Sequence, residues 1–327
     1  MAKRRLNDQQ KNRIEKNRRE LVQAFLEGTA RPGLEQALVI SQQPRIAIVK
    51  DRQQRIHKAL LRQHVGPVVC GDQVIIEPGK GTDTASLLAV LPRRTQLDKS
   101  LSGGNSKLFA ANIDLLLIVL ACEPEPRLEL LDRYLVIAEH AGITPMIVLN
   151  KIDLLQAFST DSPPYQLQDY QALGYQVHFT SAKQCAGLPT LTSCLASKTG
   201  IFAGQSGVGK SSLTLRLIPD LDEQRRIQTN ALSSASHGRH TTSMSVLYTL
   251  SHGGHIIDSP GVRDIGLEHL DTRQVAQGFV EFRPYLGRCR FADCRHRQEP
   301  GCALQQAVEQ GKIAARRLAS YHKIIAA

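Results

Sequence analysis

One run of residues indicates the fold class: Gly204-Gln205-Ser206-Gly207-Val208-Gly209-Lys210-Ser211 fits the phosphate-binding loop pattern G-x-x-x-x-G-K-[ST]. The apolar run 201–203 precedes it and the periodic run 211–218 follows it, so the loop joins a predicted strand to a predicted helix. Glycines let backbone N–H groups surround phosphate oxygens, and the helix N-terminus adds partial positive charge. The residues expected to bind nucleotide here are Gly204, Gln205, Ser206, Gly207, Val208, Gly209, Lys210 (catalytic, at the β- and γ-phosphates), Ser211 (also on Mg²⁺) and Ser212.

A second motif, Asn150-Lys151-Ile152-Asp153, follows the predicted strand 145–150 and matches the N-K-x-D sequence of guanine-specific nucleotidases. Its aspartate accepts hydrogen bonds from guanine N1–H and the 2-amino group, a donor pair that adenine lacks. The segment 180–183, Thr-Ser-Ala-Lys, follows another predicted strand and matches the loop whose backbone N–H groups contact guanine O6. Either motif alone is a common loop sequence. The presence of a phosphate-binding loop in the same chain is what favours interpreting both as guanine-binding loops. The residues expected to hold the base are Asn150, Lys151, Asp153, Ser181 and Ala182.

The γ-phosphate side of the site is predicted from Asp258-Ser-Pro-Gly261, a D-x-x-G sequence after the predicted strand 254–258. Asp258 would hold Mg²⁺ through water, and the Gly261 N–H would sense the γ-phosphate. Val262 stands where Ras-type enzymes place a water-orienting glutamine, so we expect slow intrinsic hydrolysis. His240, in the polar loop 238–243, is the nearest candidate to replace that glutamine, and the alternative is an ordinary loop histidine.

These motifs occur in an unusual order along the chain, with guanine recognition before phosphate binding. Each still follows a strand, and the carboxyl ends of parallel strands gather a ligand at one edge of an α/β sheet. Circular permutation moves the termini without moving those loops. We therefore infer a circularly permuted α/β P-loop GTPase domain over residues 101–265, flanked by other domains.

Five short strand-like runs precede this domain, and Gly- and Pro-containing turns separate them. They are ALVISQ (37–42), RIAIVKD (45–51), RIHKALLR (55–62), DQVIIEP (72–78) and SLLAVLP (86–92). Five strands in fewer than seventy residues predict a small barrel of OB or SH3 type over residues 34–100. Such barrels often bind RNA, although the fold alone does not establish it.

Charge and composition favour a polyanionic partner. The 327 residues carry 41 Lys and Arg against 30 Asp and Glu, a formal charge of +11. Eight of the basic residues lie within positions 1–20. We expect the extension 1–33 to begin with a disordered leader that can contact RNA phosphates. The apolar run 115–122 is too short for a bilayer span, and no secretory signal is recognised, so we expect a cytoplasmic monomer without membrane contact.

A cysteine cluster near the carboxyl end has metal-binding spacing, Cys289-x₄-Cys294-x-His296-x₅-Cys302. Three thiolates and one imidazole form a complete tetrahedral set for one structural Zn²⁺ ion, with no position left open for catalysis. Free buried cysteines beside a chance histidine are the alternative. The surrounding sequence is helical and arginine-rich, so residues 266–327 are predicted to form a helical zinc-binding domain that can face RNA.

With these motifs in hand, the chain resembles the RsgA (YjeQ) family of circularly permuted GTPases that act in small ribosomal subunit biogenesis. The resemblance rests on GQSGVGKSSL (204–213), NKID (150–153), HTT (240–242), DSPGVR (258–263) and the cysteine cluster. It implies an OB-fold, a permuted GTPase domain and a zinc domain, binding to the immature small subunit and its rRNA, and hydrolysis of GTP to GDP stimulated by the ribosome. It also implies that Thr242 is the Mg²⁺-binding threonine of switch I and that His240 acts in hydrolysis. Ser243 departs from the family, in which a third threonine is common.

Two alternatives remain at this point. One is an RNA-binding assembly protein that uses GTP as a conformational clamp, with negligible turnover. The other is a metabolic P-loop kinase, which the guanine-specific motif disfavours.

Overall fold

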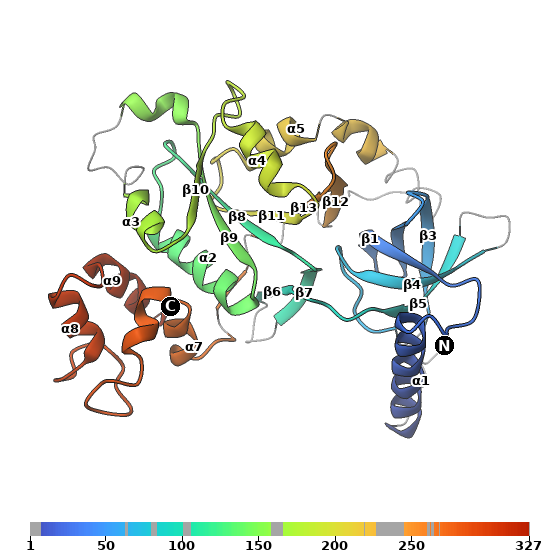
Figure 1. Cartoon of the computed structure of the whole chain (residues 1–327), viewed down its shortest axis with the longest axis horizontal. Coiled ribbons are helices and arrows are strands. Elements are labelled where there is room, and N and C mark those ends of the chain that lie inside the picture. Colours follow the sequence, from blue (N-terminus) through green and yellow to red (C-terminus); the bar gives the residue numbers. More distant parts are fainter. Residues whose placement is uncertain are drawn as a thin grey trace.

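Three structural units lie side by side along the long axis of the molecule: a β-barrel, a central α/β sheet and a helical carboxyl-terminal unit (Figure 1). The computed structural model describes residues 8–62, 65–79, 84–100, 106–157, 166–218, 220–226, 245–259, 262, 265–267 and 269–326. Among these residues, no helix combines the length and apolar character needed to cross a membrane. The predicted multidomain architecture, with a barrel, an α/β domain and a helical carboxyl-terminal unit, is confirmed.

The barrel closes because its first strand pairs at both edges. Its strands are β1 (Glu35–Gln43), β2 (Ile46–Asp51), β3 (Ile56–Leu61), β4 (Gln73–Pro78) and β5 (Thr84–Val90). Strand β1 pairs with β2 and β4, and β3 runs parallel to β5, which gives the cyclic order β1-β2-β3-β5-β4. Alternate apolar residues, including Val39, Val49 and Leu87, fill its interior. All five predicted runs form strands, and their closed five-stranded arrangement is OB-like.

The expected disordered leader is wrong for residues 8–26, which form helix α1 (Asp8–Leu26). Leu21, Val22 and Phe25 of this helix pack against Leu34 and against strands of the barrel. Arg18 adds a hydrogen bond of 2.8 Å from Nη1 to the Val65 carbonyl. These apolar residues have helical spacing but begin at position 21, after the basic run from which disorder was predicted. The amino-terminal end of α1 projects away from the barrel (Figure 1).

The central sheet brings five strands into parallel alignment. In spatial order they are β10 (Gln176–Phe179), β9 (Thr144–Asn150), β8 (Leu115–Ala121), β11 (Thr199–Ala203) and β13 (His255–Asp258). The antiparallel strand β12 (Val246–Thr249) follows β13 and also pairs with the barrel at Ser41. A hairpin of β6 (Gln96–Ser100) and β7 (Ser106–Ala111) leads from barrel to sheet and spans the expected domain boundary at 100/101. The predicted parallel sheet is therefore present.

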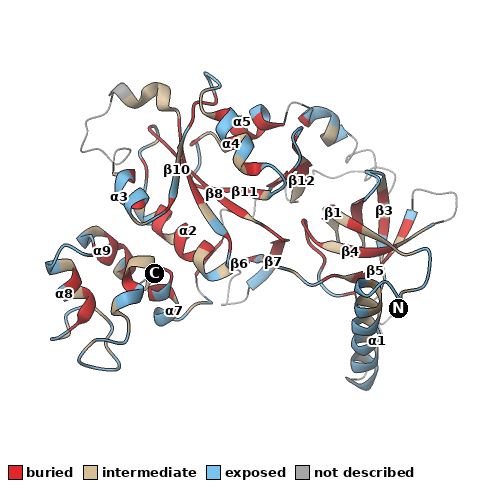
Figure 2. Cartoon of the chain, in the orientation of Figure 1, coloured by how far each residue is buried: buried red, intermediate tan, exposed pale blue. Residues whose placement is uncertain are grey.

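Helices cover both faces of this sheet. Alternate residues of β8 point into two different cores, Leu116, Ile118 and Leu120 into one and Leu115, Leu117 and Val119 into the other. The first core holds α2 (Leu128–Ala141) and α3 (Leu167–Ala172), and the second holds α4 (Leu188–Leu195) and α5 (Lys210–Leu217). Figure 2 shows the buried residues concentrated on the strands between these helical layers. The loops at the carboxyl ends of β9, β10, β11 and β13 consequently share one edge.

The carboxyl-terminal unit consists of α7 (Thr272–Gln277), the 3₁₀ helix η3 (Val280–Tyr285), α8 (Ala303–Glu309) and α9 (Ala315–Ile324). Its centre is aromatic, with Phe279 stacked on Phe282 at 4.7 Å between ring centroids and Tyr321 edge-on to both. Helix α9 lies against α2 of the central domain. The metal-binding sequence occupies the irregular segment between η3 and α8.

A buried ion cluster joins this unit to the central domain. Arg317 of α9 is 1% exposed and donates from Nε to Glu281 at 2.6 Å and from Nη1 to Asp132 of α2. The Tyr170 hydroxyl of α3 donates to the same Asp132 carboxylate at 2.5 Å. Arg317 also lies over the Phe279 ring, 4.5 Å from its centroid. One guanidinium therefore neutralises two buried carboxylates from different units.

We predict that Arg317→Met weakens this junction by about 3–5 kcal/mol, because two buried carboxylates lose their counter-charge. Hydrogen–deuterium exchange of residues 303–326 would measure it as faster opening of α8 and α9. The matched control is Lys323→Met on the same helix, whose ion pair with Glu129 of α2 is solvent-exposed and should contribute little. Equal exchange in the two variants would contradict the prediction.

Candidate nucleotide-binding and metal sites

The phosphate-binding loop follows β11 and leads into α5, and its glycines cannot be replaced without strain. Gly204, Gly207 and Gly209 have φ angles of +131°, +83° and +97°, in the region that favours glycine. A Cβ atom on Gly204 would lie 2.2 Å from the Val119 carbonyl oxygen, and one on Gly209 would lie 2.3 Å from Asn150 Nδ2. The loop is thereby held close to β8 and to the end of β9.

Lys210, the first residue of α5, extends its ammonium group back across the loop. Its Nζ donates to the carbonyl oxygens of Gly204 at 2.8 Å and Gln205 at 2.6 Å. These contacts place a positive charge beside the N-terminus of α5, where the helix dipole also favours anions. This arrangement can accept the phosphates of a nucleotide.

Asn150 connects the phosphate-binding loop to the predicted guanine loops. Its side chain is buried, and Nδ2 donates to the Val208 carbonyl at 2.9 Å. Its Oδ1 accepts from Ala182 N at 3.1 Å and from Thr180 Oγ1 at 3.3 Å. One amide group thus fixes the separation of three loops that are far apart in the sequence.

Asp153 and Ser181 are joined by a direct hydrogen bond, from Ser181 Oγ to Asp153 Oδ1 at 2.5 Å. This bond is the main reason that the pKa of Asp153 lies below its ordinary value, so the carboxylate is ionised at neutral pH. Ser181 Oγ also accepts from Gln184 N at 3.1 Å, which fixes its rotamer. Lys151, at φ +60°, donates from Nζ to the Glu123 carbonyl at 2.7 Å. An ionised carboxylate held in this way can accept two hydrogen bonds from a base.

Two cavities lie on either side of the phosphate-binding loop. The first, of about 570 Å³, is lined by predicted residues from three loops, namely Asn150, Lys151, Asp153, Ala182, Gly209 and Ser212. The second, of about 210 Å³, is lined by the predicted residues Gly204, Lys210, Ser211 and Asp258. The four motifs therefore meet around one loop, with the predicted base-recognition residues on one side and the predicted phosphate and metal residues on the other.

Some predicted residues line neither cavity. Val208 is buried and contributes its carbonyl to Asn150, Gln205 donates to the Glu125 carbonyl at 3.3 Å, and Ser206 and Gly207 are exposed. Ser181 lies outside both cavities and donates a hydrogen bond to Asp153. His240, Thr242 and Gly261 lie outside the residues that the structure describes.

Three residues that line the first cavity were not predicted from the sequence: Leu154, Leu215 and Arg216. Lys183, the last residue of the predicted 180–183 loop, lines it as well. Arg216 lies four residues after Ser212, and therefore on the same face of α5. This helical spacing could have indicated that Arg216 lies beside the nucleotide-binding residues. Glu123 gave no signal, because it acts through its backbone carbonyl.

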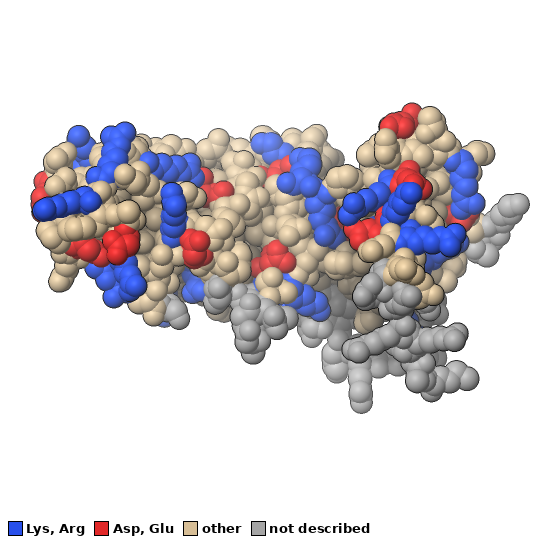
Figure 3. Space-filling model, turned by 90° about the horizontal axis from the view of Figure 1, so that it is seen from below, with Lys and Arg blue, Asp and Glu red and all other residues tan. Residues whose placement is uncertain are grey.

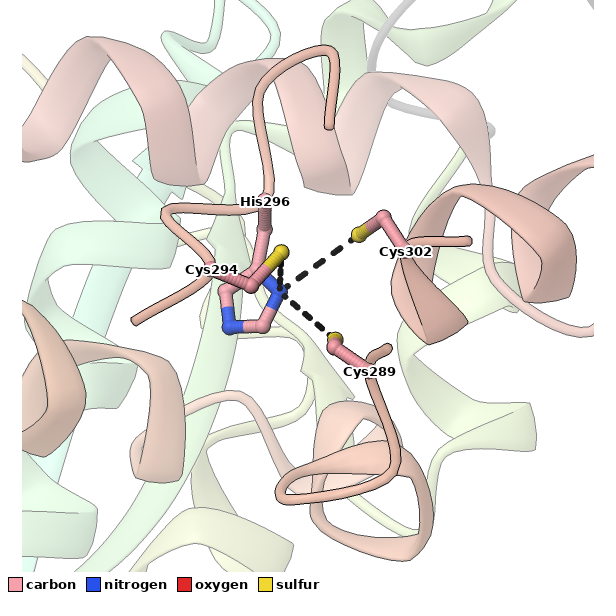
Figure 4. Close-up of side chains that lie close together, drawn as sticks. All are labelled: Cys289, Cys294, His296 and Cys302. Carbon is pink, nitrogen blue, oxygen red and sulfur yellow. Dashed lines mark hydrogen bonds between the residues drawn. The ribbon is translucent and has the colours of Figure 1, made fainter. Parts of the chain in front are cut away.

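The predicted metal ligands converge on one point (Figure 4). The sulfur atoms of Cys289, Cys294 and Cys302 lie 3.4, 3.6 and 3.5 Å from His296 Nδ1, and all four ligand atoms lie within 4.8 Å of one another. Tetrahedral Zn²⁺, with Zn–S of about 2.3 Å and Zn–N of about 2.0 Å, requires sulfur–nitrogen distances of about 3.5 Å. The donor set therefore fits zinc in both chemistry and geometry.

Neighbouring groups orient these ligands. The Ala303 N–H at the start of α8 donates to Cys289 Sγ at 3.4 Å, and His322 Nε2 donates to the His296 carbonyl at 2.7 Å. Burial raises the pKa of Cys294 to about 12, so its thiolate needs a nearby cation at neutral pH. Groups that hydrogen-bond to the ligand residues, as Ala303 and His322 do here, are typical of structural metal sites.

Together the fold and these loops define a P-loop GTPase domain in which the motifs occur in permuted order. The family model described as RsgA GTPase matches residues 90–268. The chain belongs to the RsgA GTPase family, whose members hydrolyse GTP.

Full-length relatives support this assignment. The "Small ribosomal subunit biogenesis GTPase RsgA" of Chromohalobacter salexigens is 50% identical over 273 residues, which cover 82% of this chain and 78% of the relative. The protein of the same name from Hahella chejuensis is 42% identical and covers 99% and 96% of the two chains.

Solved structures agree with the sequence matches. YjeQ from Thermotoga maritima has a TM-score of 0.68 and 27% identity over 90% of this chain and 98% of that one. YloQ, described as a circularly permuted GTPase, has a TM-score of 0.69 and 25% identity over 90% and 94%. The permutation inferred from motif order is therefore confirmed.

We predict that Asp153→Asn lowers GDP affinity by at least about tenfold, since hydrogen bonds to a charged group contribute about 1.5–3 kcal/mol each. Affinity for xanthosine diphosphate should rise, because the variant amide can donate to the 2-oxo group of xanthine. Calorimetric titration of both nucleotides measures the reversal. Parallel losses for both would argue that Asp153 supports the fold rather than reads the base.

Cys294→Ser should abolish stoichiometric zinc binding, a larger effect than the roughly 10- to 100-fold loss typical of an outer-shell partner. Metal analysis of purified protein gives the measurement. Cys185→Ser is the control, because that exposed cysteine lies outside the cluster. One zinc per chain in the Cys294 variant would refute the ligand assignment.

Proposed function

We propose that this protein binds the immature small ribosomal subunit late in its maturation and hydrolyses GTP to GDP and phosphate when the subunit stimulates it. The observation that carries the proposal is the meeting of the four motif loops around one phosphate-binding loop, in a chain of the RsgA GTPase family. The small-subunit role named in the full-length relatives supports the choice of partner. Such a protein would act in the cytoplasm, as a monomer.

The nucleotide is proposed to lie across both cavities. Asn150, Asp153 and the 180–183 loop hold guanine, and Lys151 covers it. The phosphates occupy the loop from Gly204 to Ser212, with Lys210 at the β- and γ-phosphates. Mg²⁺, when bound, neutralises charge that develops on the phosphate oxygens.

The magnesium-facing residues are proposed to be Ser211 and Thr242 directly and Asp258 through water. Gly261 would contact the γ-phosphate by its N–H group. Val262 is 3% exposed and its side chain carries no polar atom, so this side chain cannot orient the attacking water as a glutamine would. This supports a role for His240 in hydrolysis and is consistent with a site that the subunit completes.

The zinc-binding segment is proposed to contact rRNA. Arg288, Arg290, Arg295 and Arg297 surround the metal ligands. Phe291 in the same segment is 44% exposed, with the Arg290 guanidinium 5.5 Å from its ring centroid. Exposed aromatic and arginine side chains stack on unpaired RNA bases and pair with phosphates. Figure 3 shows further Lys and Arg residues along one face, from the helical unit to the barrel, with acidic residues among them.

We predict that small subunits raise the rate of GTP turnover, and that His240→Ala lowers the stimulated rate by about 100-fold or more, the usual contribution of a group that handles the water proton. Steady-state phosphate release with and without subunits measures both effects. His252→Ala, which alters an exposed histidine in the turn after β12, is the control. Turnover unchanged by subunits would favour a conformational clamp instead.

A further inference from the structure

Arg216 links the helix after the phosphate-binding loop to the predicted guanine loop. Its Nε donates to the Ala182 carbonyl at 3.1 Å, and both residues line the larger cavity together with Ser212. The phosphate-binding motif ends at Ser211, so it does not require an arginine at position 216. None of the nucleotide-binding motifs therefore predicts the contact between Arg216 and Ala182.

This contact completes the restraint of one peptide segment. The Ala182 N–H donates to Asn150 Oδ1 at 3.1 Å, at the end of β9, while the Ala182 carbonyl accepts from Arg216 on α5. Ala182 is 6% exposed and packs in the same core as Val208 and Leu213. Both polar groups of Ala182 are therefore fixed by different elements of the nucleotide site.

The restraint acts on the neighbouring N–H group as well. The Ala182 carbonyl and the Lys183 N–H belong to one planar peptide unit, so fixing the oxygen fixes the direction of that N–H. A guanidinium on the oxygen also polarises the unit and strengthens the N–H as a donor. Lys183 lines the same cavity.

We propose that Arg216 is a positioning residue for guanine recognition, which holds the 182–183 peptide so that the Lys183 N–H meets the O6 atom of the base. This inference rests on the proposed guanine site. It assigns selectivity at position 6 of the base to α5, whereas selectivity at position 2 belongs to Asp153.

The two selectivities can be measured separately with GDP analogues. In 6-thio-GDP, a larger sulfur that is a weaker acceptor replaces O6, while IDP lacks only the 2-amino group. Arg216→Met should reduce the preference for GDP over 6-thio-GDP by about fivefold, the factor that one hydrogen bond contributes. The preference for GDP over IDP should stay within about twofold of wild type. Calorimetric titration of the full chain gives both ratios.

Arg226→Met is the matched control, because it removes an exposed arginine from the segment that follows α5 and should alter neither ratio. The inference is overturned if Arg216→Met leaves the 6-thio-GDP ratio unchanged, or if it reduces both ratios equally, as general damage to the site would. Wild-type protein that binds ADP as tightly as GDP would overturn the proposed guanine site itself. If the wild-type protein prefers guanine and Arg216→Met does not change that preference, only the role of Arg216 is contradicted and the guanine site stands.

Discussion

The nucleotide site depends on the side-chain amide of Asn150. This group donates to the phosphate-binding loop at Val208 and accepts from the predicted guanine loop at Ala182. Because the amide is buried, both bonds lie in a low-dielectric environment, and losing either would leave an unpaired polar group. The parallel sheet brings the loops to one edge, and Asn150 sets their spacing. This is why permuted chain order leaves the geometry intact.

A second buried interaction determines how the zinc-binding unit relates to this site. Arg317 joins Glu281 of the carboxyl-terminal unit to Asp132 of α2, and Tyr170 of α3 shares the same carboxylate. A flexible linker alone would allow independent motion of the two units. Here the zinc segment and its arginines are held on the layer of helices that packs beneath β9 and β10. An RNA contact made by the zinc segment would therefore be mechanically connected to the strands that carry the guanine loops.

Several features followed from the sequence because their chemistry tolerates few alternatives. Gly204 and Gly209 lie so close to neighbouring atoms that no other residue fits, and Cys289, Cys294, His296 and Cys302 have the spacing that tetrahedral zinc requires. Helix α1 was missed because its anchoring residues Leu21, Val22 and Phe25 follow a strongly basic run, and tertiary packing on the barrel outweighed that local signal.

The loops, the donor set for a metal and the permuted order of the motifs could be predicted because each lies in a short run of residues with restricted chemistry. The side chains that connect those loops could not, because their contacts depend on tertiary packing. The Asn150 bridge, the Arg216 contact with Ala182 and the Arg317 cluster join residues 32, 34 and 185 positions apart. No local pattern reports such pairs, because they form only when the sheet and its helices pack.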